Sequence, residues 1–239
     1  MRLFDMHSHI LPDFDDGAKT NEEAVELINC LSRQNVKNIC LTPHFYTNEM
    51  SVEQFARSRD EAFKKFKSSI PNDINVVLGA EVFVTRYLFG NEDLSLVTYG
   101  NSDYILVEFG YSDKFSNSTM ECFYRLLDNY GLIPVITHIE RYPALIDNLD
   151  KVAELKDKGV VIQTNISNFA KKAPVFRRKK LTKLIDRGYI DILGSDAHSF
   201  EYNSPEVFSQ AIEHITSKCG QEVIVRMMKN AEEIFNAAK

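Results

Sequence analysis

The sequence predicts an α/β fold, a distorted TIM-like (β/α)7 barrel in which residues 1–239 form a single domain. Short apolar segments alternate regularly with segments of helical periodicity, which is typical of a parallel sheet covered by helices. Nearly every apolar segment ends at a histidine or a carboxylate. Because the C-terminal ends of the strands in a parallel barrel meet at one mouth, this pattern predicts one shared site there. No glycine-rich turn follows the first expected strand, whereas such a turn is typical of open sheets that bind dinucleotides. Its absence favours the barrel over an open sheet.

Seven segments are expected to form the strands of this barrel. They are residues 3–6, 38–42, 75–80, 104–107, 133–137, 160–164 and 191–194. Thr20 and Glu23 have the spacing of a capping box, as have Ser51 and Gln54, and an amphipathic helix is expected to follow each pair. The helices after the last strand are expected to begin near Pro205, since proline is favoured in the first helical turn.

Length and charge limit the classes of protein to which the chain can belong. The 239 residues would suffice for one barrel or for two small domains, and no linker-like segment divides them, which favours one domain. The net charge of -6 and the pI of about 5.6 argue against nucleic acid as a partner. The basic run 177–180, with Lys171 and Lys172 before it, is expected to be a solvent-exposed helix face.

Cysteine spacing and hydropathy predict a soluble, cytoplasmic protein without membrane insertion. The four cysteines show no CxxC or metal-finger spacing and are expected to be reduced: Cys30, Cys40, Cys122 and Cys219. The first ten residues contain charges and histidines, unlike a signal peptide, and no apolar segment approaches membrane-spanning length.

The residues at the expected strand ends form a candidate metal-binding set. They are His7, His9, His44, Glu81, Glu108, His138, Asp196 and His198, and they include five of the six histidines. Imidazoles and carboxylates without a thiolate suit divalent manganese, iron or zinc, and there are too many ligands for one ion. Each residue alone could be an exposed loop residue or a histidine within the core. Their occurrence at so many strand ends together favours a polynuclear metal site.

Several local motifs occur in order along the chain. They are DMHSHILP at 5–12, an acidic loop ending in DDG at 15–17, TPH at 42–44, GAE at 79–81, Glu108, THIERY at 137–142 and GSDAH at 194–198. With these motifs the chain resembles the polymerase-and-histidinol-phosphatase (PHP) superfamily. Within it, the chain is most similar to the bacterial metal-dependent tyrosine-protein phosphatases of capsule and exopolysaccharide regulation. The resemblance covers essentially the whole chain.

The resemblance implies a site that holds three divalent ions, often manganese. One ion would be held by His7, His9, Glu81 and Asp196. Glu81 would bridge to a second ion, held also by Glu108 and His138. Asp16, His44 and His198 would hold the third. Arg141 would contact the substrate phosphate, and a protonated His44 or His198 is a candidate general acid.

The resemblance implies that the chain hydrolyses phosphotyrosine on a protein. The implied substrate is the tail of a bacterial tyrosine kinase, and the implied nucleophile is a hydroxide generated by the metal ions. The chain departs from the family pattern where Phe45 and Tyr46 replace the usual basic residues, and where 199–203 contains no arginine. Phe45, Tyr46, Tyr111 and Phe115 lie in segments that would reach the mouth of the barrel, so they are candidates for an aromatic wall around the substrate ring. Packing in the core is the more common fate of such side chains.

Two other functions remain open from the sequence. The first is a phosphatase for a small metabolite such as histidinol phosphate, which would have a deeper pocket. The second is a non-catalytic module of the same superfamily that binds metal only structurally or docks a polymerase. Loss of ligands would mark such a module, and none of the nine is missing.

Overall fold

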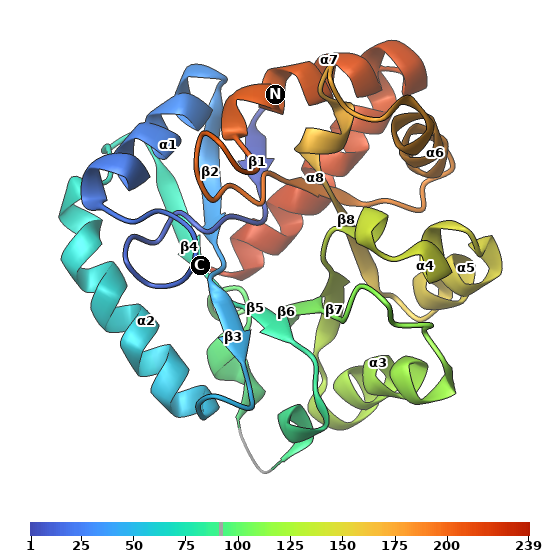
Figure 1. Cartoon of the computed structure of the whole chain (residues 1–239), viewed down its shortest axis with the longest axis horizontal. Helices are drawn as coiled ribbons and strands as arrows, with labels where there is room; N and C mark the ends of the chain where they lie inside the picture. The colour runs from blue at the N-terminus through green and yellow to red at the C-terminus, as the bar shows by residue number, and fades with distance from the viewer. Residues whose placement is uncertain (91–92) are drawn as a thin grey trace.

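The computed structural model describes residues 1–90 and 93–239 (Figure 1). In this part of the chain there are nine strands, and all their pairings are parallel. The strands are β1 Leu3–Asp5, β2 Val36–Leu41, β3 His44–Tyr46, β4 Asn75–Leu78, β5 Glu81–Phe83, β6 Tyr104–Glu108, β7 Ile133–Ile136, β8 Val161–Asn165 and β9 Ile192–Gly194. The expected α/β fold with parallel strands is confirmed.

The strands follow one another in a circle. A three-stranded sheet has the order β1-β2-β4, and a six-stranded sheet has the order β3-β5-β6-β7-β8-β9. The chain passes directly from β2 into β3 and from β4 into β5, so the two sheets are continuous. Hydrogen bonds from Met6 N to Leu193 O (3.2 Å) and from His9 N to Ala197 O (3.0 Å) connect the end of β1 to the end of β9.

The difference between seven expected strands and nine observed ones comes from two interruptions. Pro43 has no N–H to donate, and it separates β2 from β3. Gly79 and Ala80 separate β4 from β5. The second strand ends before Pro43, as expected, but the return of the chain to a sheet at His44 was not expected. Each of the other five strands matches its predicted segment within one residue at either end.

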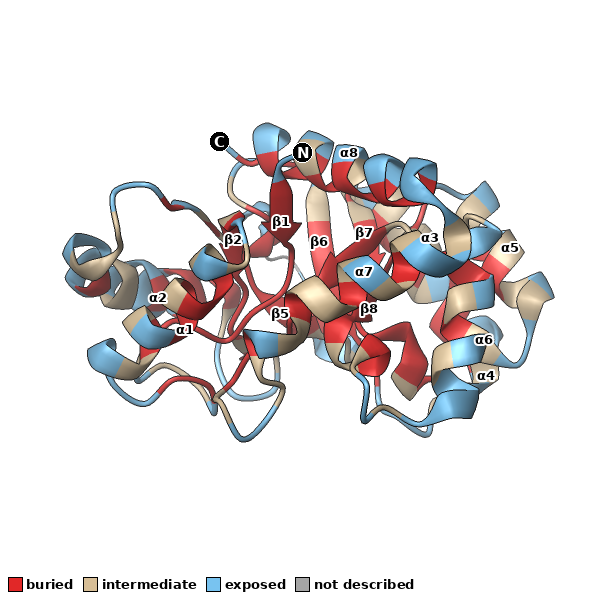
Figure 2. Ribbon diagram, turned by 90° about the horizontal axis from the view of Figure 1, so that it is seen from above, coloured by how far each residue is buried: buried red, intermediate tan, exposed pale blue. Residues whose placement is uncertain are grey.

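Most helices surround the strands, whereas α8 crosses behind them (Figure 1). The described α-helices are α1 Asn21–Arg33, α2 Val52–Phe66, α3 Asn117–Tyr130, α4 Pro143–Ile146, α5 Leu149–Asp157, α6 Val175–Asp186, α7 Phe208–Cys219 and α8 Gln221–Ala237. The described short 3-10 helices are η1 Lys67–Ser69, η2 Arg86–Phe89, η3 Leu94–Val97, η4 Ile139–Arg141, η5 Ile166–Phe169 and η6 Pro205–Val207. Figure 2 shows that buried residues are concentrated on the strands and on the helix faces that cover them.

The two predicted helix starts are present, with one difference in a cap. Thr20 accepts a hydrogen bond from Glu23 N (3.1 Å), but the Glu23 carboxylate accepts from Lys19 N (2.8 Å) instead of completing a capping box. Ser51 and Gln54 do form the full capping box at the start of α2. Pro205 opens a 3-10 turn, and α7 begins three residues later.

The cysteines and the hydropathy of the helices can be compared with the sequence expectations. All four cysteines are free, and Cys30 and Cys40 are buried. Within residues 1–90 and 93–239, no helix combines the length and the apolar composition needed to cross a membrane.

Gly194, the last residue of β9, has a tightly restricted position beside the mouth of the barrel. A Cβ atom on Gly194 would lie 2.6 Å from His7 Cβ and 2.7 Å from Gln163 Nε2. Both of these side chains are fully buried, so neither can move aside easily.

We therefore expect Gly194→Ala to lower the free energy of unfolding by about 1–3 kcal/mol, the usual cost of overpacking a core. Chemical denaturation in the presence of a chelator would measure this without a contribution from bound metal. Gly110→Ala is the control, because a Cβ atom there meets nothing within 4 Å. Equal stability of the Gly194 and Gly110 variants would contradict the packing argument.

Candidate metal centre

The structure brings all nine predicted ligands together at the mouth of the barrel. His7 and His9 follow β1, Asp16 lies before α1, His44 and Glu81 begin β3 and β5, Glu108 ends β6, His138 follows β7, and Asp196 and His198 follow β9. Eight of the nine are less than about one-sixth exposed, and Asp16 is the exposed member. Three groups of these side chains have ligand atoms within 4.8 Å of one another: His7, His9 and Glu81; His44, Glu81 and Glu108; and His9, Asp16, His44 and His198. Asp196 and His138 lie beside the first and second of these groups.

The first group lies deepest. His7 Nε2 and His9 Nε2 lie 3.4 Å and 3.3 Å from Glu81 Oε2. They lie 3.7 Å and 3.4 Å from Asp196 Oδ1. Both imidazole nitrogens are thus within 3.7 Å of both carboxylates.

The second group shares Glu81 with the first. His138 Nε2 lies 2.8 Å from Glu81 Oε1 and 3.4 Å from Glu108 Oε1. His44 Nδ1 lies 3.0 Å from Glu81 Oε2 and 3.9 Å from Glu108 Oε2. The two oxygens of Glu81 thus face different histidines, which is the geometry needed for a bridging carboxylate.

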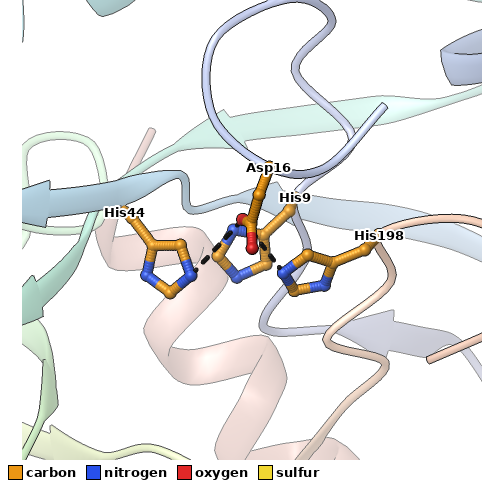
Figure 3. A group of neighbouring side chains, drawn as sticks. All are labelled: His9, Asp16, His44 and His198. Carbon is orange, nitrogen blue, oxygen red and sulfur yellow. Dashed lines mark ion pairs between the residues drawn. The ribbon is translucent and has the colours of Figure 1, made fainter. Parts of the chain in front are cut away.

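The third group is nearest the surface, and Figure 3 shows its members facing one another. Asp16 Oδ1 lies 3.6 Å from His44 Nε2 and 3.3 Å from His198 Nε2. The ring of His9 is stacked on that of His198 at 4.1 Å, so His9 lies between the first and third groups.

Unpaired polar atoms indicate that divalent cations fit this cluster. His7 Nδ1, His44 Nδ1 and Glu81 Oε2 are buried without a hydrogen bond in the described part of the chain. His7 Nε2 and His9 Nε2 face each other at 3.1 Å. Buried polar atoms normally have partners, and converging lone pairs of imidazole and carboxylate are the donor set of divalent metals. The donor atoms of this cluster are therefore suited to bind divalent metal ions.

Neighbouring groups of opposite charge shift the pKa values of the side chains in the cluster. Burial lowers the pKa of His138, but hydrogen bonds to Glu108 and Glu81 outweigh burial and bring the pKa to about 9. Burial raises the pKa of Glu81, but the surrounding histidines, His7 foremost, hold it well below its usual range. The carboxylate of Glu81 is thus stable in its ionised form, the form that binds a cation.

Asp15 is a site residue that the sequence analysis did not assign, although it belongs to the same acidic loop as Asp16. Its Oδ2 atom lies 2.7 Å from His9 Nδ1 and accepts from His44 N (3.0 Å). Burial raises the pKa of Asp15, but His9 and backbone donors outweigh it and lower the pKa to about 2. Because Asp15 binds the outer nitrogen of His9, it orients the inner nitrogen toward the cluster.

Asp196 connects the cluster to Arg141. Asp196 Oδ2 accepts from Arg141 Nη2 (2.7 Å), Asn165 Nδ2 (2.7 Å) and Asn203 Nδ2 (2.8 Å). These three donors leave Oδ1 free to face the histidines. Asn203 belongs to the segment 199–203, which contains no arginine.

Two ligands occupy strained backbone positions at strand ends. His138 and Asp196 have φ angles of 26° and 54°, which non-glycine residues rarely adopt. Gln163 Oε1 accepts from His138 N (2.6 Å), and His7 O accepts from Asp196 N (2.8 Å). The surrounding hydrogen bonds therefore stabilise two bends that turn these side chains into the mouth.

A pocket of about 310 Å³ opens above the cluster. Its lining includes Arg141, His44 and His198 together with the aromatic side chains Tyr46, Phe83, Phe109, Tyr111 and Tyr202. Phe45 is 1% exposed and packs on Phe55 of α2, with ring centres 4.7 Å apart. Side chains alternate along β3, so His44 and Tyr46 face the pocket and Phe45 faces the core. The aromatic wall therefore does not include Phe45, nor does it include Phe115, which is also 1% exposed.

The comparisons with known proteins agree with this site. A family model described as "Capsular polysaccharide synthesis, CpsB/CapC" matches residues 3–236. The putative tyrosine-protein phosphatase CapC of Staphylococcus aureus is 30% identical over 237 residues, which cover 98% of this chain and 91% of CapC. The tyrosine-protein phosphatase CpsB of Streptococcus pneumoniae is 31% identical over 251 residues, with 98% and 95% covered.

Solved structures show the same relationship. One solved structure comes from a study of YwqE from Bacillus subtilis and CpsB from Streptococcus pneumoniae, described as unique metal-dependent tyrosine phosphatases. It superposes on this chain with a TM-score of 0.79 at 25% identity, and the match covers 99% of this chain and 96% of that one. A phosphotriesterase homology protein from Escherichia coli shares the fold, with a TM-score of 0.58 at 16% identity over 98% of each chain.

A parallel barrel with imidazoles and carboxylates at its mouth defines the class of barrel-type hydrolases. Within that class, the chain belongs to the CpsB/CapC family of capsular polysaccharide synthesis. The resemblance seen in the sequence motifs is confirmed.

The shared position of Glu81 predicts a specific loss of metal. We expect Glu81→Gln to bind at least one manganese ion fewer per chain than the parent protein, because an amide cannot supply the charge that both groups use. Elemental analysis after dialysis against manganese would measure this. Glu121→Gln, on the exposed face of α3, is the control. Unchanged manganese content in the folded Glu81 variant would contradict the bridging role.

Proposed function

We propose that this protein is a metal-dependent phosphomonoester hydrolase that acts on phosphotyrosine in proteins. The observation that carries the proposal is the cluster of nine imidazole and carboxylate side chains at the mouth of the barrel, of which Asp16, His44, Glu108 and His198 line one pocket together with Arg141. Its relatives CapC and CpsB are named as tyrosine-protein phosphatases, which supports the choice of substrate.

We propose three divalent ions, with manganese as the resident metal and iron or zinc as alternatives. His7, His9, Glu81 and Asp196 would hold the first, Glu81, Glu108 and His138 the second, and Asp16, His44 and His198 the third. When bound, the ions supply a water activated near neutral pH and positive charge for the phosphoryl oxygens. The distances within the three groups support this division.

Arg141 is suited to bind the phosphate itself. Its side chain is 22% exposed and lines the pocket, where it donates to Asp196 Oδ2 and to the Tyr111 hydroxyl, each at 2.7 Å. A guanidinium has five N–H donors, so three remain for the oxygens of a phosphate dianion. Asp196 and Tyr111 thus fix the plane of the guanidinium before substrate binds.

Tyrosine side chains at the rim are suited to the ring of a phosphotyrosine. Tyr46 stacks on His44 with ring centres 5.4 Å apart, and Tyr111 and Tyr202 are 55% and 53% exposed. Burial raises the pKa of Tyr46 to about 12. The phenol therefore stays neutral and does not repel the substrate dianion. An open rim with exposed rings favours a residue presented on a protein surface over a small enclosed metabolite.

His44 and His198 line the same pocket and were expected as candidate acids. A phenolate leaves with little help from an acid because its pKa is low compared with that of an alkoxide. We therefore propose that their main contribution to catalysis is to hold an ion with Asp16.

A thiolate mechanism is not supported by the cysteines. The residues six positions after them are Val36, Tyr46, Asp128 and Val225, none of which can clamp a phosphate as an arginine does. Burial also raises the pKa of the Cys40 thiol well above its usual range, which opposes formation of a thiolate.

The wider setting is also a proposal. We propose that residues 1–239 act as one domain, supported by a family match from residue 3 to residue 236. We propose a cytoplasmic location, supported by four free cysteines, since free thiols are typical of reducing compartments. The proposed partner is the phosphorylated tail of a cognate bacterial tyrosine kinase, because the family is defined by capsular polysaccharide synthesis.

Metal dependence gives the first test of this function. We expect a chelator to abolish hydrolysis of a phosphotyrosine peptide and added manganese to restore it, because the pocket offers no other source of an activated nucleophile among its described residues. Histidinol phosphate should be a poor substrate in the same assay. Full turnover by protein shown by elemental analysis to be metal-free would refute the mechanism.

Arg141 gives the second test. We expect Arg141→Ala to reduce kcat/KM by about two orders of magnitude, the scale for one lost charged contact to a transition state. Manganese content should not change, because Asn165 and Asn203 still hold Asp196. Arg141→Lys should recover only part of the loss, since an ammonium lacks the planar fork. Arg57→Ala, on the exposed face of α2, is the control. A wild-type kcat/KM in Arg141→Ala would show that Arg141 does not meet the substrate.

A further inference from the structure

Charge is distributed very unevenly along this acidic chain. The segment from Lys171 to Arg187 contains eight of the 28 lysine and arginine residues and one of the 34 aspartate and glutamate residues. Most of the segment is α6. A strongly basic segment in a chain with a net charge of -6 indicates an acidic partner at that place.

One face of α6 presents this charge together with an exposed aromatic ring. Phe176, Lys180, Lys183 and Arg187 are spaced by four, three and four residues, which places them on one side of a helix. Phe176 is 89% exposed, the largest value among the exposed large hydrophobic residues described. Lys183 and Arg187 have no ion-pair partner within residues 1–90 and 93–239, whereas Lys180 is paired with Asp147.

This face borders a groove of about 260 Å³ between α6 and the segment that joins α4 to α5. Its apolar lining residues, the floor of the groove, are Ile146, Leu149 and Leu184, and its charged lining residues are Lys180, Lys183, Arg187 and Asp147, which is paired with Lys180. Figures 1 and 2 show α4, α5 and α6 together at the same end of the molecule. An apolar floor beside unpaired cations fits an acidic peptide that carries an apolar side chain.

The groove is connected to the phosphate pocket through a short piece of chain. Arg141 lines the pocket, and Ile146, only five residues further on, lines the groove. Because an extended chain spans at most about 3.6 Å per residue, the Cα atoms of Arg141 and Ile146 are no more than about 18 Å apart.

We propose that the α6 groove, meaning the face from Phe176 to Arg187 and the groove beside it, docks an acidic segment of the phosphotyrosine protein, with an apolar residue on its floor. This proposal rests on the proposed function for the identity of the partner. An anionic membrane is the less suitable occupant, because a groove of about 260 Å³ fits a single apolar side chain better than a flat surface of headgroups. The acidic segment adds affinity without taking part in the chemistry.

The test uses the full chain loaded with manganese and a binding measurement that needs no turnover. The probe is a fluorescent 15-residue peptide of Glu, Ser and Gly with one central Leu and no phosphate; a second peptide has Gln in place of every Glu. We expect fluorescence anisotropy to show binding of the Glu peptide alone. The K183E/R187E variant should weaken it at least about tenfold, and Phe176→Ser should weaken it by a smaller factor.

The matched control is K64E/K65E, which makes the same change in net charge on exposed lysines of α2. It should change binding of the Glu peptide less than about twofold. An equal loss in K64E/K65E would overturn the proposal, because binding would then follow net charge alone. Absence of peptide binding, or binding only to vesicles of one part phosphatidylserine to three parts phosphatidylcholine, would overturn it as well.

Kinetics distinguish failure of this proposal from failure of the proposed function. Turnover of p-nitrophenyl phosphate reports on the function and should be the same in K183E/R187E and the parent protein. A phosphotyrosine peptide joined to the acidic segment should show a KM raised several-fold in K183E/R187E at unchanged kcat. If the KM for the joined peptide is unchanged in K183E/R187E while p-nitrophenyl phosphate is still hydrolysed, the docking role is overturned. If the parent protein does not hydrolyse p-nitrophenyl phosphate, the proposed function alone is refuted.

Discussion

The structure depends on one buried carboxylate, that of Glu81, placed among four imidazoles. Its two oxygens lie between 2.8 and 3.4 Å from nitrogen atoms of His7, His9, His44 and His138. An ionised carboxylate in the interior is costly unless opposite charge surrounds it. One oxygen of Glu81 nevertheless has no hydrogen bond in the described chain. Bound divalent cations would satisfy this oxygen and the converging imidazoles at the same time, and so make the cluster stable at the mouth.

The interruptions of the second and third strands position this carboxylate. β3 begins at His44 and β5 at Glu81, and these two residues are paired in register across the parallel strands. Without the breaks at Pro43 and at Gly79, the strands would continue with a different alternation of side chains. The irregularity that makes the barrel distorted is therefore the feature that brings His44 and Glu81 side by side. The strained backbone of His138 and Asp196 likewise turns these side chains into the mouth, at the ends of β7 and β9.

Much of the fold and of the site could be predicted from the sequence, because strand–helix alternation and polar residues at strand ends are local signals. Asp15 and Asn203 could not be assigned, since their roles depend on contacts with His9 and Asp196 that only the folded chain makes. Phe45 was expected at the pocket because β3 was not expected as a strand. Once β3 is recognised, its alternation places Phe45 in the core.

The most direct test of the account is to locate metal in the protein itself. Crystals grown with manganese, measured at a wavelength where manganese scatters anomalously, would show the position of each ion independently of any activity. The account predicts three anomalous peaks, one within each group, with the first two on either side of the Glu81 carboxylate. The absence of peaks at the mouth of the barrel in fully soaked crystals would contradict it.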